Sequence, residues 1–247
     1  MKSHRSSFEN SWDNQIRAES YAKLEFPNTY YLAYRDLPKI ISDHVDGKKA
    51  IDFGCGTGRS TRFLKKLGLH AIGVDISKDM LQIAMESDKS GDYQIVSNGN
   101  YGHLGISQFD LVQSIFTFDN IPGWENRTNI LKGLSRLLKQ SGKLILLASS
   151  PELYTNEWAS FSTKDFPSNW AAKTGDIVRD IMLDVEDKRP VEDIFWTISD
   201  YELLFELAGL SVAATYKPLG SKEEPYEWIS EMRIAPWTIF VLSKVQD

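Results

Sequence analysis

The chain has 247 residues, a formal net charge of −6 and one cysteine. This length is sufficient for one domain with a large core, with or without a cap. The acidic charge argues against binding to a nucleic-acid backbone, and the single cysteine excludes a disulfide framework and a cysteine-based metal site. No apolar run reaches the roughly 20 residues of a membrane span, and the polar residues 1–7 do not match a secretory signal. We therefore expect no membrane association and a cytoplasmic location.

The segment 1–44 precedes the first predicted strand and is rich in aromatic residues. We expect it to be helical, with Pro27 and Pro38 dividing it into two or three pieces, because proline interrupts a helix. Its aromatic side chains either pack on the outer helices or cover a ligand, and the pattern leaves both interpretations open.

A glycine-rich turn, Gly54-Cys55-Gly56-Thr57-Gly58, separates an apolar strand at 49–53 from a helix predicted at 59–67. The alternating glycines allow positive φ and close approach of the backbone, and the following helix start suits an anionic ligand group. A second strand at 69–74 ends at Asp75, about 20 residues after the first glycine, where an acid is placed to hold a ribose diol. The pattern predicts a nucleoside-containing cofactor bound across two parallel strands.

The glycine spacing distinguishes between candidate cofactors. A nicotinamide site requires G-x-G-x-x-G, and Arg59 occupies the position of the third glycine. Asp52, just before the turn, would repel a diphosphate but suits an ammonium group. The spacing therefore favours a cofactor with an amino group and a ribose over a dinucleotide.

The sequence Asp52-Phe53-Gly54-Cys55-Gly56-Thr57-Gly58, followed by Val74-Asp75-Ile76-Ser77, closely resembles the cofactor motifs of class I S-adenosylmethionine-dependent methyltransferases. The resemblance implies an α/β fold with a Rossmann-like seven-stranded sheet, mostly parallel, with helices on both faces. It also implies that the last strand inserts antiparallel between strands five and six. We expect residues 1–44 to form an N-terminal helical lid and residues 45–247 the methyltransferase domain.

Further strands are expected at 93–96, 109–114, 143–148, 210–216 and 235–242, with helices at 78–85 and 130–138. A capping box formed by Ser199 and Glu202 predicts that another helix starts there. The segment from about 150 to 197 is too long for an ordinary connection, so we interpret it as a cap inserted after strand five. It either contributes substrate contacts or is a hydrophobic cover with no direct role in binding.

The resemblance implies a set of residues that bind the donor, S-adenosyl-L-methionine, whose product is S-adenosyl-L-homocysteine. The expected donor contacts are Asp52, Gly54, Cys55, Gly56, Gly58, Asp75, Ile76, Met80, Gly99, Asn100, Tyr101, Ile115 and Phe116. Met80 is placed to lie along the adenine, although core packing explains it equally well. Family members often have Gly-Asp-Ala where this chain has Gly99-Asn100-Tyr101, and asparagine can still accept the adenine hydrogen bond.

Methyl transfer from a sulfonium is an in-line displacement, so the protein mainly positions the nucleophile, and a base is needed only for a nucleophile that retains its proton. Asp119 is the first candidate for a catalytic base or substrate anchor and His103 the second. Their alternatives are a turn or helix-cap residue and a surface histidine. The expected substrate contacts are Phe118, Asn120, Tyr154, Trp158 and Trp196. No metal site is expected, because the histidines are scattered and no acid-rich cluster follows strand five.

These observations predict a methyltransferase acting on a small-molecule acceptor, such as a heterocycle, a phenol or an amine, as a monomer or homodimer. N-, O- and C-methylation remain open. The alternatives are a non-catalytic protein that binds S-adenosylmethionine or S-adenosylhomocysteine, and an NAD-dependent oxidoreductase.

Overall fold

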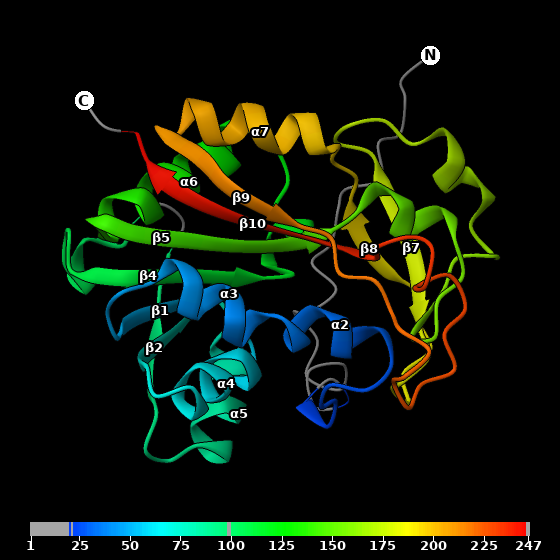
Figure 1. The fold of residues 1–247 in the computed structure, drawn as a ribbon, viewed down its shortest axis with the longest axis horizontal. Helices are drawn as coiled ribbons and strands as arrows, with labels where there is room; N and C mark the ends of the chain where they lie inside the picture. The colour runs from blue at the N-terminus through cyan, green and yellow to red at the C-terminus, as the bar shows by residue number, and fades with distance from the viewer. Residues whose placement is uncertain (1–19, 21, 98–99, 246–247) are drawn as a thin grey trace.

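A seven-stranded sheet forms the centre of the computed structural model, which describes residues 20, 22–97 and 100–245 (Figure 1). The strand order is β3-β2-β1-β4-β5-β10-β9. Strands β1 to β5 pair in parallel, whereas β10 is antiparallel to both β5 and β9. The strands span Lys49–Phe53 (β1), His70–Asp75 (β2), Asp92–Ile95 (β3), Phe109–Ile115 (β4), Leu138–Ser149 (β5), Leu210–Tyr216 (β9) and Trp237–Lys244 (β10). The predicted fold class and the antiparallel position of the last strand are confirmed.

Helices cover both faces of this sheet. They span Thr29–Arg35 (α2), Leu37–His44 (α3), Arg59–Lys66 (α4), Lys78–Ser87 (α5), Trp124–Leu137 (α6) and Ile198–Leu207 (α7), with short 3-10 helices at Gly102–Leu104 (η1), Thr117–Asn120 (η2), Pro151–Thr155 (η3) and Pro167–Ala171 (η4). Along β1, Ala50 packs with residues of α3 and α4, whereas Ile51 packs with residues of α6 and α7. Side chains alternate between the faces of a strand, so each face of the sheet has its own hydrophobic core.

The segment between β5 and α7 folds as a separate small sheet. Its antiparallel strands are β6 (Phe161–Ser162), β7 (Ile177–Met182) and β8 (Val191–Ile194), in the order β6-β7-β8. This cap follows the carboxyl end of β5 and lies at the right of the main sheet in Figure 1. In an open parallel sheet, ligands bind at that end of the strands, so the cap lies over the expected site.

Several boundaries differ from those predicted, among them the start of α6 at Trp124 instead of residue 130. Helix α7 starts at the capping box of Thr197 and Asp200, in which each residue's side chain accepts from the other's backbone N–H, and the box predicted from Ser199 and Glu202 is wrong. Both pairs have the same spacing, so the sequence pattern could not separate them. Strand β5 starts at Leu138 rather than 143, because Leu138 pairs with Phe109 across a register shift in β4.

A buried hydrogen-bond network joins α2 to the cap and to the loop before β10. The Thr29 and Ser160 side chains accept from each other's backbone N–H at 2.9 and 3.0 Å. The carboxyl group of Glu231 accepts from Thr29 Oγ1 at 2.6 Å and from Ala159 N at 2.7 Å. Trp237 Nε1 donates to Thr29 O at 3.0 Å. Residues 1–19 and 21 of the expected lid lie outside the described residues, so the lid assignment stays a prediction.

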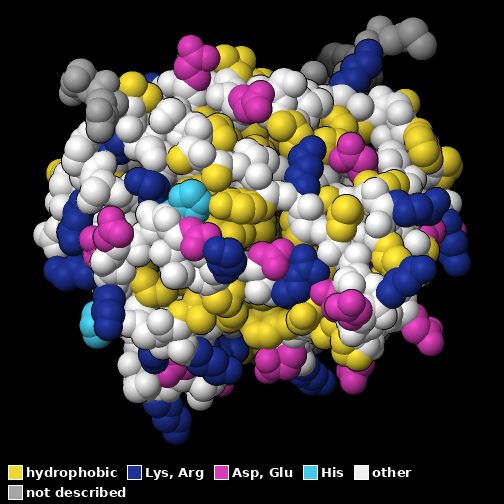
Figure 2. All heavy atoms as spheres, in the orientation of Figure 1, with side chains coloured by type: hydrophobic (Ala, Val, Ile, Leu, Met, Phe, Trp, Pro, Cys, Tyr) yellow, Lys and Arg dark blue, Asp and Glu magenta, His cyan; other side chains and the backbone are white. Residues whose placement is uncertain are grey.

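The surface carries charges of both signs. On the face shown in Figure 2, lysine and arginine side chains are interspersed with acidic ones, and hydrophobic side chains gather in a band across the middle. Within the part of the chain that the structure describes, no helix is both long enough and apolar enough to cross a membrane.

Candidate active site

A cavity of about 180 Å³ opens at the carboxyl ends of β1, β2 and β4 and extends under the cap. Its lining on the side of the main sheet includes Gly54, Gly56, Asp75, Ile76, Met80 and Phe116. Its lining on the side of the cap includes Phe161, Asp180, Met182, Val191 and Asp193, and Trp237 at the start of β10 also lines it. The predicted motif and the predicted cap therefore meet at the same cavity.

The glycine turn leaves its backbone accessible from the cavity, because Gly54 and Gly56 have no side chains. Gly54 has φ +71°, and a Cβ there would lie 2.1 Å from Oγ1 of Thr117. Gly56 has φ +53°, and a Cβ there would meet no heavy atom within 4 Å, because it would project into the open cavity. This bare stretch of backbone is a cradle that a ligand can approach closely.

Asp75, at the end of β2, faces this cradle. Its Oδ2 accepts from Gly56 N at 2.8 Å, and its Oδ1 accepts from Ser77 N at 2.9 Å. A carboxylate oxygen can accept more than one hydrogen bond, so both oxygens retain the capacity to accept from the two hydroxyls of a ribose. Ile76 and Met80 lie next to it in the lining and offer apolar surface for a purine ring. The cradle, the acid and the apolar wall together fit the nucleoside of S-adenosylmethionine.

Phe116, directly after β4, has a left-handed backbone with φ +62°. Its ring packs against Tyr30 at a centroid distance of 5.8 Å and against Trp237 at 4.8 Å. A non-glycine residue in this conformation costs free energy and persists only where the surroundings hold it. The packing therefore fixes the backbone of β4's carboxyl end, including Ile115, against the cavity.

Asp119 is buried in η2 and lines the cavity. It accepts from Ser149 Oγ at 2.8 Å, from Ser149 N at 3.2 Å and from the Tyr201 hydroxyl at 3.4 Å. Burial raises the pKa of Asp119 to about 6, although the hydrogen bonds from Ser149 act in the opposite direction. A carboxyl group with this pKa can exchange a proton near neutral pH.

Two further acids in the lining, Asp180 and Asp193, were not identified from the sequence. They lie on β7 and β8 and are only 2% and 7% exposed. Burial, with Asp119 and Asp180 close by, raises the pKa of Asp193 well above its usual range. The sequence analysis considered only the residues directly after strand five, whereas these acids come from a hairpin further along the chain. Over the described residues, no group of three or more His, Cys, Asp or Glu side chains could hold a metal ion.

Asp52 lies outside the cavity lining, although the sequence predicted a donor contact. It is fully buried and accepts from Ser60 Oγ and Thr61 Oγ1, both at 2.6 Å. Its side chain shares a face of β1 with Ala50, the face that α4 covers, because alternate residues of a strand point the same way. In the structure Asp52 fixes the start of α4 behind the glycine turn.

Several other predicted donor contacts also lie outside the lining. Cys55 is buried, and Gly58 has φ +79° and allows Tyr93 to approach, since a Cβ there would lie 2.7 Å from the Tyr93 hydroxyl. Asn100 is exposed, and Tyr101 packs against Phe53. Gly99 falls outside the described residues. Ile115 lines the cavity as predicted.

Of the predicted acceptor contacts, Asn120 lines the cavity and the others do not. Trp158 is buried and donates to Leu153 O at 2.8 Å, and Tyr154 donates to Asp193 Oδ2 at 3.1 Å. Phe118 is buried, and Trp196 lies under the guanidinium of Arg127, 4.0 Å from it.

His103 is exposed in η1 and contributes nothing to the lining. The aromatic composition predicted a cap over the site, but it did not show which aromatic rings line the cavity.

Arg59, at the position of the third glycine of a dinucleotide motif, has a defined role. It is buried and donates to Leu24 O at 3.2 Å and to Glu25 O at 2.8 Å. Its guanidinium lies 5.3 Å from the ring centre of Tyr30 and 5.7 Å from that of Tyr34. The arginine therefore attaches the segment before α2 to the start of α4.

A family model described as "Methyltransferase domain" matches residues 51–146, which include the glycine turn, Asp75 and β4. The N-demethylindolmycin N-methyltransferase of Streptomyces griseus is 23% identical over 206 residues, covering 80% of this chain and 86% of that protein. A ubiquinone biosynthesis O-methyltransferase of Thiobacillus denitrificans is 31% identical over 100 residues, 39% of this chain and 42% of its own length.

Solved structures share the fold. The CcbJ methyltransferase of Streptomyces caelestis superposes with a TM-score of 0.69 at 14% identity, covering 97% of this chain and all of that chain (100%). An S-adenosylmethionine-dependent methyltransferase of Clostridium acetobutylicum gives a TM-score of 0.62 at 14% identity, covering 95% of this chain and 96% of that one. The domain match coincides with the residues that form the cradle, so residues 51–146 are a methyltransferase domain, and the whole chain shares the fold of solved S-adenosylmethionine-dependent methyltransferases.

Proposed function

We propose that the protein methylates a small-molecule acceptor held between the donor cradle and the cap. The observation that carries this proposal is the continuous cavity, with Gly56 and Asp75 at one end and Asp180 and Met182 at the other. The relatives' names support a small acceptor, since they refer to N-demethylindolmycin and to ubiquinone biosynthesis. One name specifies N-methylation and the other O-methylation, so the names leave the acceptor atom of this chain open.

We further propose the donor contacts. Asp75 accepts from the ribose hydroxyls, Ile76 and Met80 flank the adenine, and the glycine turn approaches the methionine portion. S-adenosylmethionine supplies an activated methyl group together with its leaving group. The chain's own contribution is to orient the two reactants and to exclude water, for which the buried cap is suited.

Asp119 and Asn120 are the proposed contacts to the acceptor on the main-sheet side. Asp119 is ionised above its pKa of about 6. The carboxylate can then accept a hydrogen bond from an N–H or O–H group of the methyl acceptor, or take up the proton of that group. Asn120 Oδ1 is buried, and within the described part of the chain it has no hydrogen-bond partner. An acceptor that brings an N–H or O–H group would satisfy both oxygens.

The proposed role of Asp119 predicts the pH dependence of turnover. Activity should rise as the pH passes through about 6 and level off above it, because only the ionised carboxylate accepts a proton. Ser149→Ala removes a hydroxyl donor that favours the ionised form, so the rise should move to higher pH. Ser150→Ala is the matched control, because Ser150 Oγ pairs with Thr238 instead. A rise at the same pH in both variants would contradict the role of Asp119.

Thermal unfolding is measured in parallel with S-adenosylmethionine, with S-adenosylhomocysteine and with NAD. This experiment tests whether the protein binds the proposed methyl donor. At about 100 times its Kd a ligand adds roughly 2.7 kcal/mol, or on the order of 5–10 °C for a chain of this size. We expect both sulfur nucleosides to raise the Tm and NAD to leave it unchanged. The next step is a screen of heterocycles, phenols and amines for methylation. Binding of the donor without turnover of any acceptor class would favour a non-catalytic binding protein.

We also propose a cytoplasmic enzyme that acts as a monomer or homodimer and does not bind nucleic acid. Sedimentation equilibrium with and without S-adenosylhomocysteine measures the oligomeric state directly.

A further inference from the structure

The side chain of Arg127 is fully buried behind η2 and does not line the cavity. It projects from near the start of α6, a helix that lies beside α7 on one face of the main sheet (Figure 1). Burying a guanidinium group costs free energy unless its donors and its charge find partners. The partners of Arg127 therefore show what this residue stabilises.

The guanidinium of Arg127 donates to the backbone on both sides of Asp119 and Asn120. Its Nε donates to Ile121 O at 2.6 Å, and its Nη2 donates to Phe118 O. Phe118 and Ile121 directly flank the pair, so one planar group fixes both ends of the segment that carries the two side chains. A lysine offers no such fork, because its ammonium group is a point charge on a flexible stem.

The segment η2 depends on contacts of this kind for its shape. It is a single turn of 3-10 helix, Thr117–Asn120, and so short a helix has few hydrogen bonds of its own. Ser149 and Tyr201 donate to the carboxyl group of Asp119 and fix that side chain. Asn120 Oδ1 has no hydrogen-bond partner among residues 20, 22–97 and 100–245. The direction of Asn120 therefore depends on the backbone that the arginine holds.

Aromatic rings hold Arg127 itself in place. Its guanidinium carbon lies 4.0 Å from the ring centre of Trp196, 5.5 Å from that of Tyr201 and 6.0 Å from that of Phe118. Contacts between a cation and an aromatic ring are stronger where water is excluded. The Tyr201 hydroxyl also donates to Asp119 Oδ1 at 3.4 Å, so the arginine and the carboxyl group share a partner on α7.

The charge of Arg127 favours the ionised form of Asp119. Burial raises the pKa of Asp119 to about 6, and the hydrogen bonds from Ser149 and the charge of Arg127 act in the opposite direction. The other titratable groups of the elements around this carboxyl group are Tyr154 in η3, Tyr201 on α7, Asp180 on β7 and Asp193 on β8. Each of these groups is neutral or negative, whereas the arginine is positive.

We propose that Arg127 is a positioning residue for methyl transfer. Its guanidinium fixes the backbone on both sides of Asp119 and Asn120, and its charge keeps the Asp119 carboxylate ionised for the methyl acceptor. This inference rests on the proposed function, in which these two side chains contact the acceptor. It assigns a role in turnover to a side chain outside the cavity.

Two substitutions separate the two roles. Arg127→Gln removes the charge and keeps an amide donor, whereas Arg127→Lys keeps the charge and loses the planar fork. Arg136→Gln is the matched control, because Arg136 is exposed in the last turn of the same helix. All three variants should bind S-adenosylhomocysteine with the Kd of the wild type in calorimetry, since neither arginine lines the cavity.

The charge is tested through the ionisation of Asp119, followed by ¹³C NMR of protein labelled at the aspartate carboxyl carbons. The Asp119 signal is the one that Asp119→Asn removes. We expect it to titrate at about pH 6 in the wild type. In Arg127→Gln it should titrate about one pH unit higher, because losing a nearby positive charge disfavours the carboxylate. In Arg127→Lys and Arg136→Gln it should titrate as in the wild type.

The fork is tested by hydrogen exchange of residues 117–121, measured by mass spectrometry with S-adenosylhomocysteine bound. Exchange there should be about 10-fold faster in Arg127→Lys, the scale of one hydrogen bond from a charged donor. Exchange of α4 should stay unchanged in the same sample.

Turnover connects both measurements to methyl transfer. The probe is the compound that the screen of heterocycles, phenols and amines shows to be methylated fastest. The ratio of wild-type to Arg127→Gln activity should fall about 5-fold between pH 6 and pH 8, because the ionised fraction of Asp119 recovers as the pH rises. The ratio of wild-type to Arg136→Gln activity should not depend on pH.

Two results would each overturn the proposal. One is an Asp119 signal that titrates at the same pH in Arg127→Gln and in the wild type, and the other is unchanged exchange of residues 117–121 in Arg127→Lys. Because each variant tests one role, a variant that does not fold leaves the other to decide. An arginine with a structural role alone would lower the Tm without moving the titration. Failure of the wild type to bind S-adenosylhomocysteine, or to methylate any acceptor class, would instead contradict the proposed function.

Discussion

Asp75→Ala should weaken binding of S-adenosylmethionine by roughly 1.5–3 kcal/mol, which is about a 10- to 150-fold higher Kd. In the proposed donor site the carboxylate accepts from the ribose hydroxyls, and in the structure it accepts from Gly56 N at 2.8 Å and from Ser77 N at 2.9 Å. The substitution therefore removes a direct contact and also loosens the glycine turn. Isothermal titration calorimetry with S-adenosylmethionine and S-adenosylhomocysteine measures the change.

Asp79→Ala is the control for charge. Asp79 is exposed in the first turn of α5 and lies outside the cavity lining, so its loss should leave both affinities unchanged. Equal affinities for wild type and Asp75→Ala would show that the ribose is held elsewhere, and the assignment of the cradle would be wrong.

Glu231→Ala should lower the free energy of unfolding by about 3–5 kcal/mol, because it leaves buried donors without an acceptor. Glu231 is fully buried and accepts from Thr29 Oγ1, from Ala159 N and from Ile229 N at 2.6–2.8 Å. These donors belong to α2, the cap and the loop before β10. The loss should appear as a decrease in Tm on the order of 10 °C by calorimetry.

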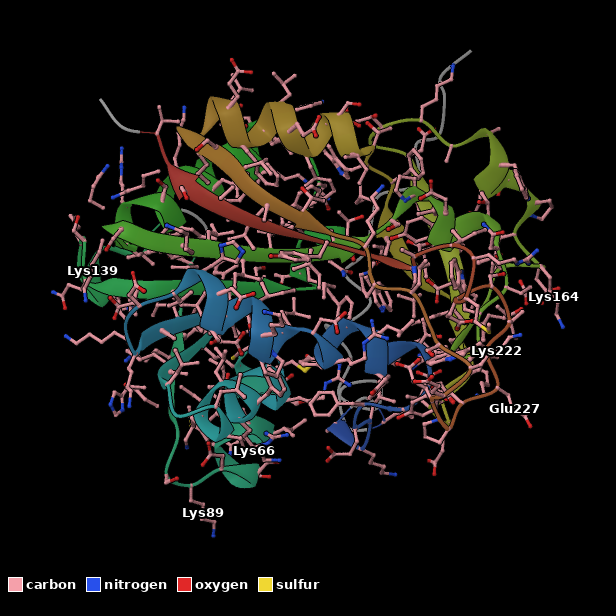
Figure 3. The ribbon with its side chains drawn as sticks, viewed as in Figure 1. Lys66, Lys89, Lys139, Lys164, Lys222 and Glu227 are labelled. Carbon is pink, nitrogen blue, oxygen red and sulfur yellow. The ribbon has the colours of Figure 1, made fainter. Side chains whose placement is uncertain are left out.

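Acceptor binding should weaken as well, because Thr29 also holds Trp237, which lines the cavity. Glu227→Ala is the matched control: Glu227 is exposed, and Figure 3 shows it extending outward from the same loop. Similar Tm values for the two alanine variants would mean that the Glu231 network contributes little to joining these segments.

The lining of the cavity on the main-sheet side could be predicted from the sequence because its parts are close along the chain. The glycine turn, the strand before it and Asp75 occupy one β-α-β unit, whose geometry is nearly invariant in parallel sheets. Gly54, Gly56, Asp75, Ile76 and Met80 all line the cavity. Asp52 was misplaced within the same unit, because the pattern did not show that its face of β1 is covered by α4.

Only the tertiary structure shows which residues come together on the cap side of the cavity, where we propose that the methyl acceptor binds. Asp180 and Asp193 approach each other through the register of β7 and β8, and Asp119 joins them because the cap folds back over the carboxyl ends of the parallel strands. Residues 177–183 form an apolar run that is compatible by itself with a strand or a short helix, and only a strand directs Asp180 inward with Val178 and Met182.

Thus the sequence by itself determined the fold class, the donor motif and the presence of an inserted cap. The tertiary structure decided which side chains of that cap face the cavity. The physical reason is that backbone geometry near a glycine turn follows from local conformational freedom, whereas the direction of a side chain on a distant hairpin follows from strand pairing and burial.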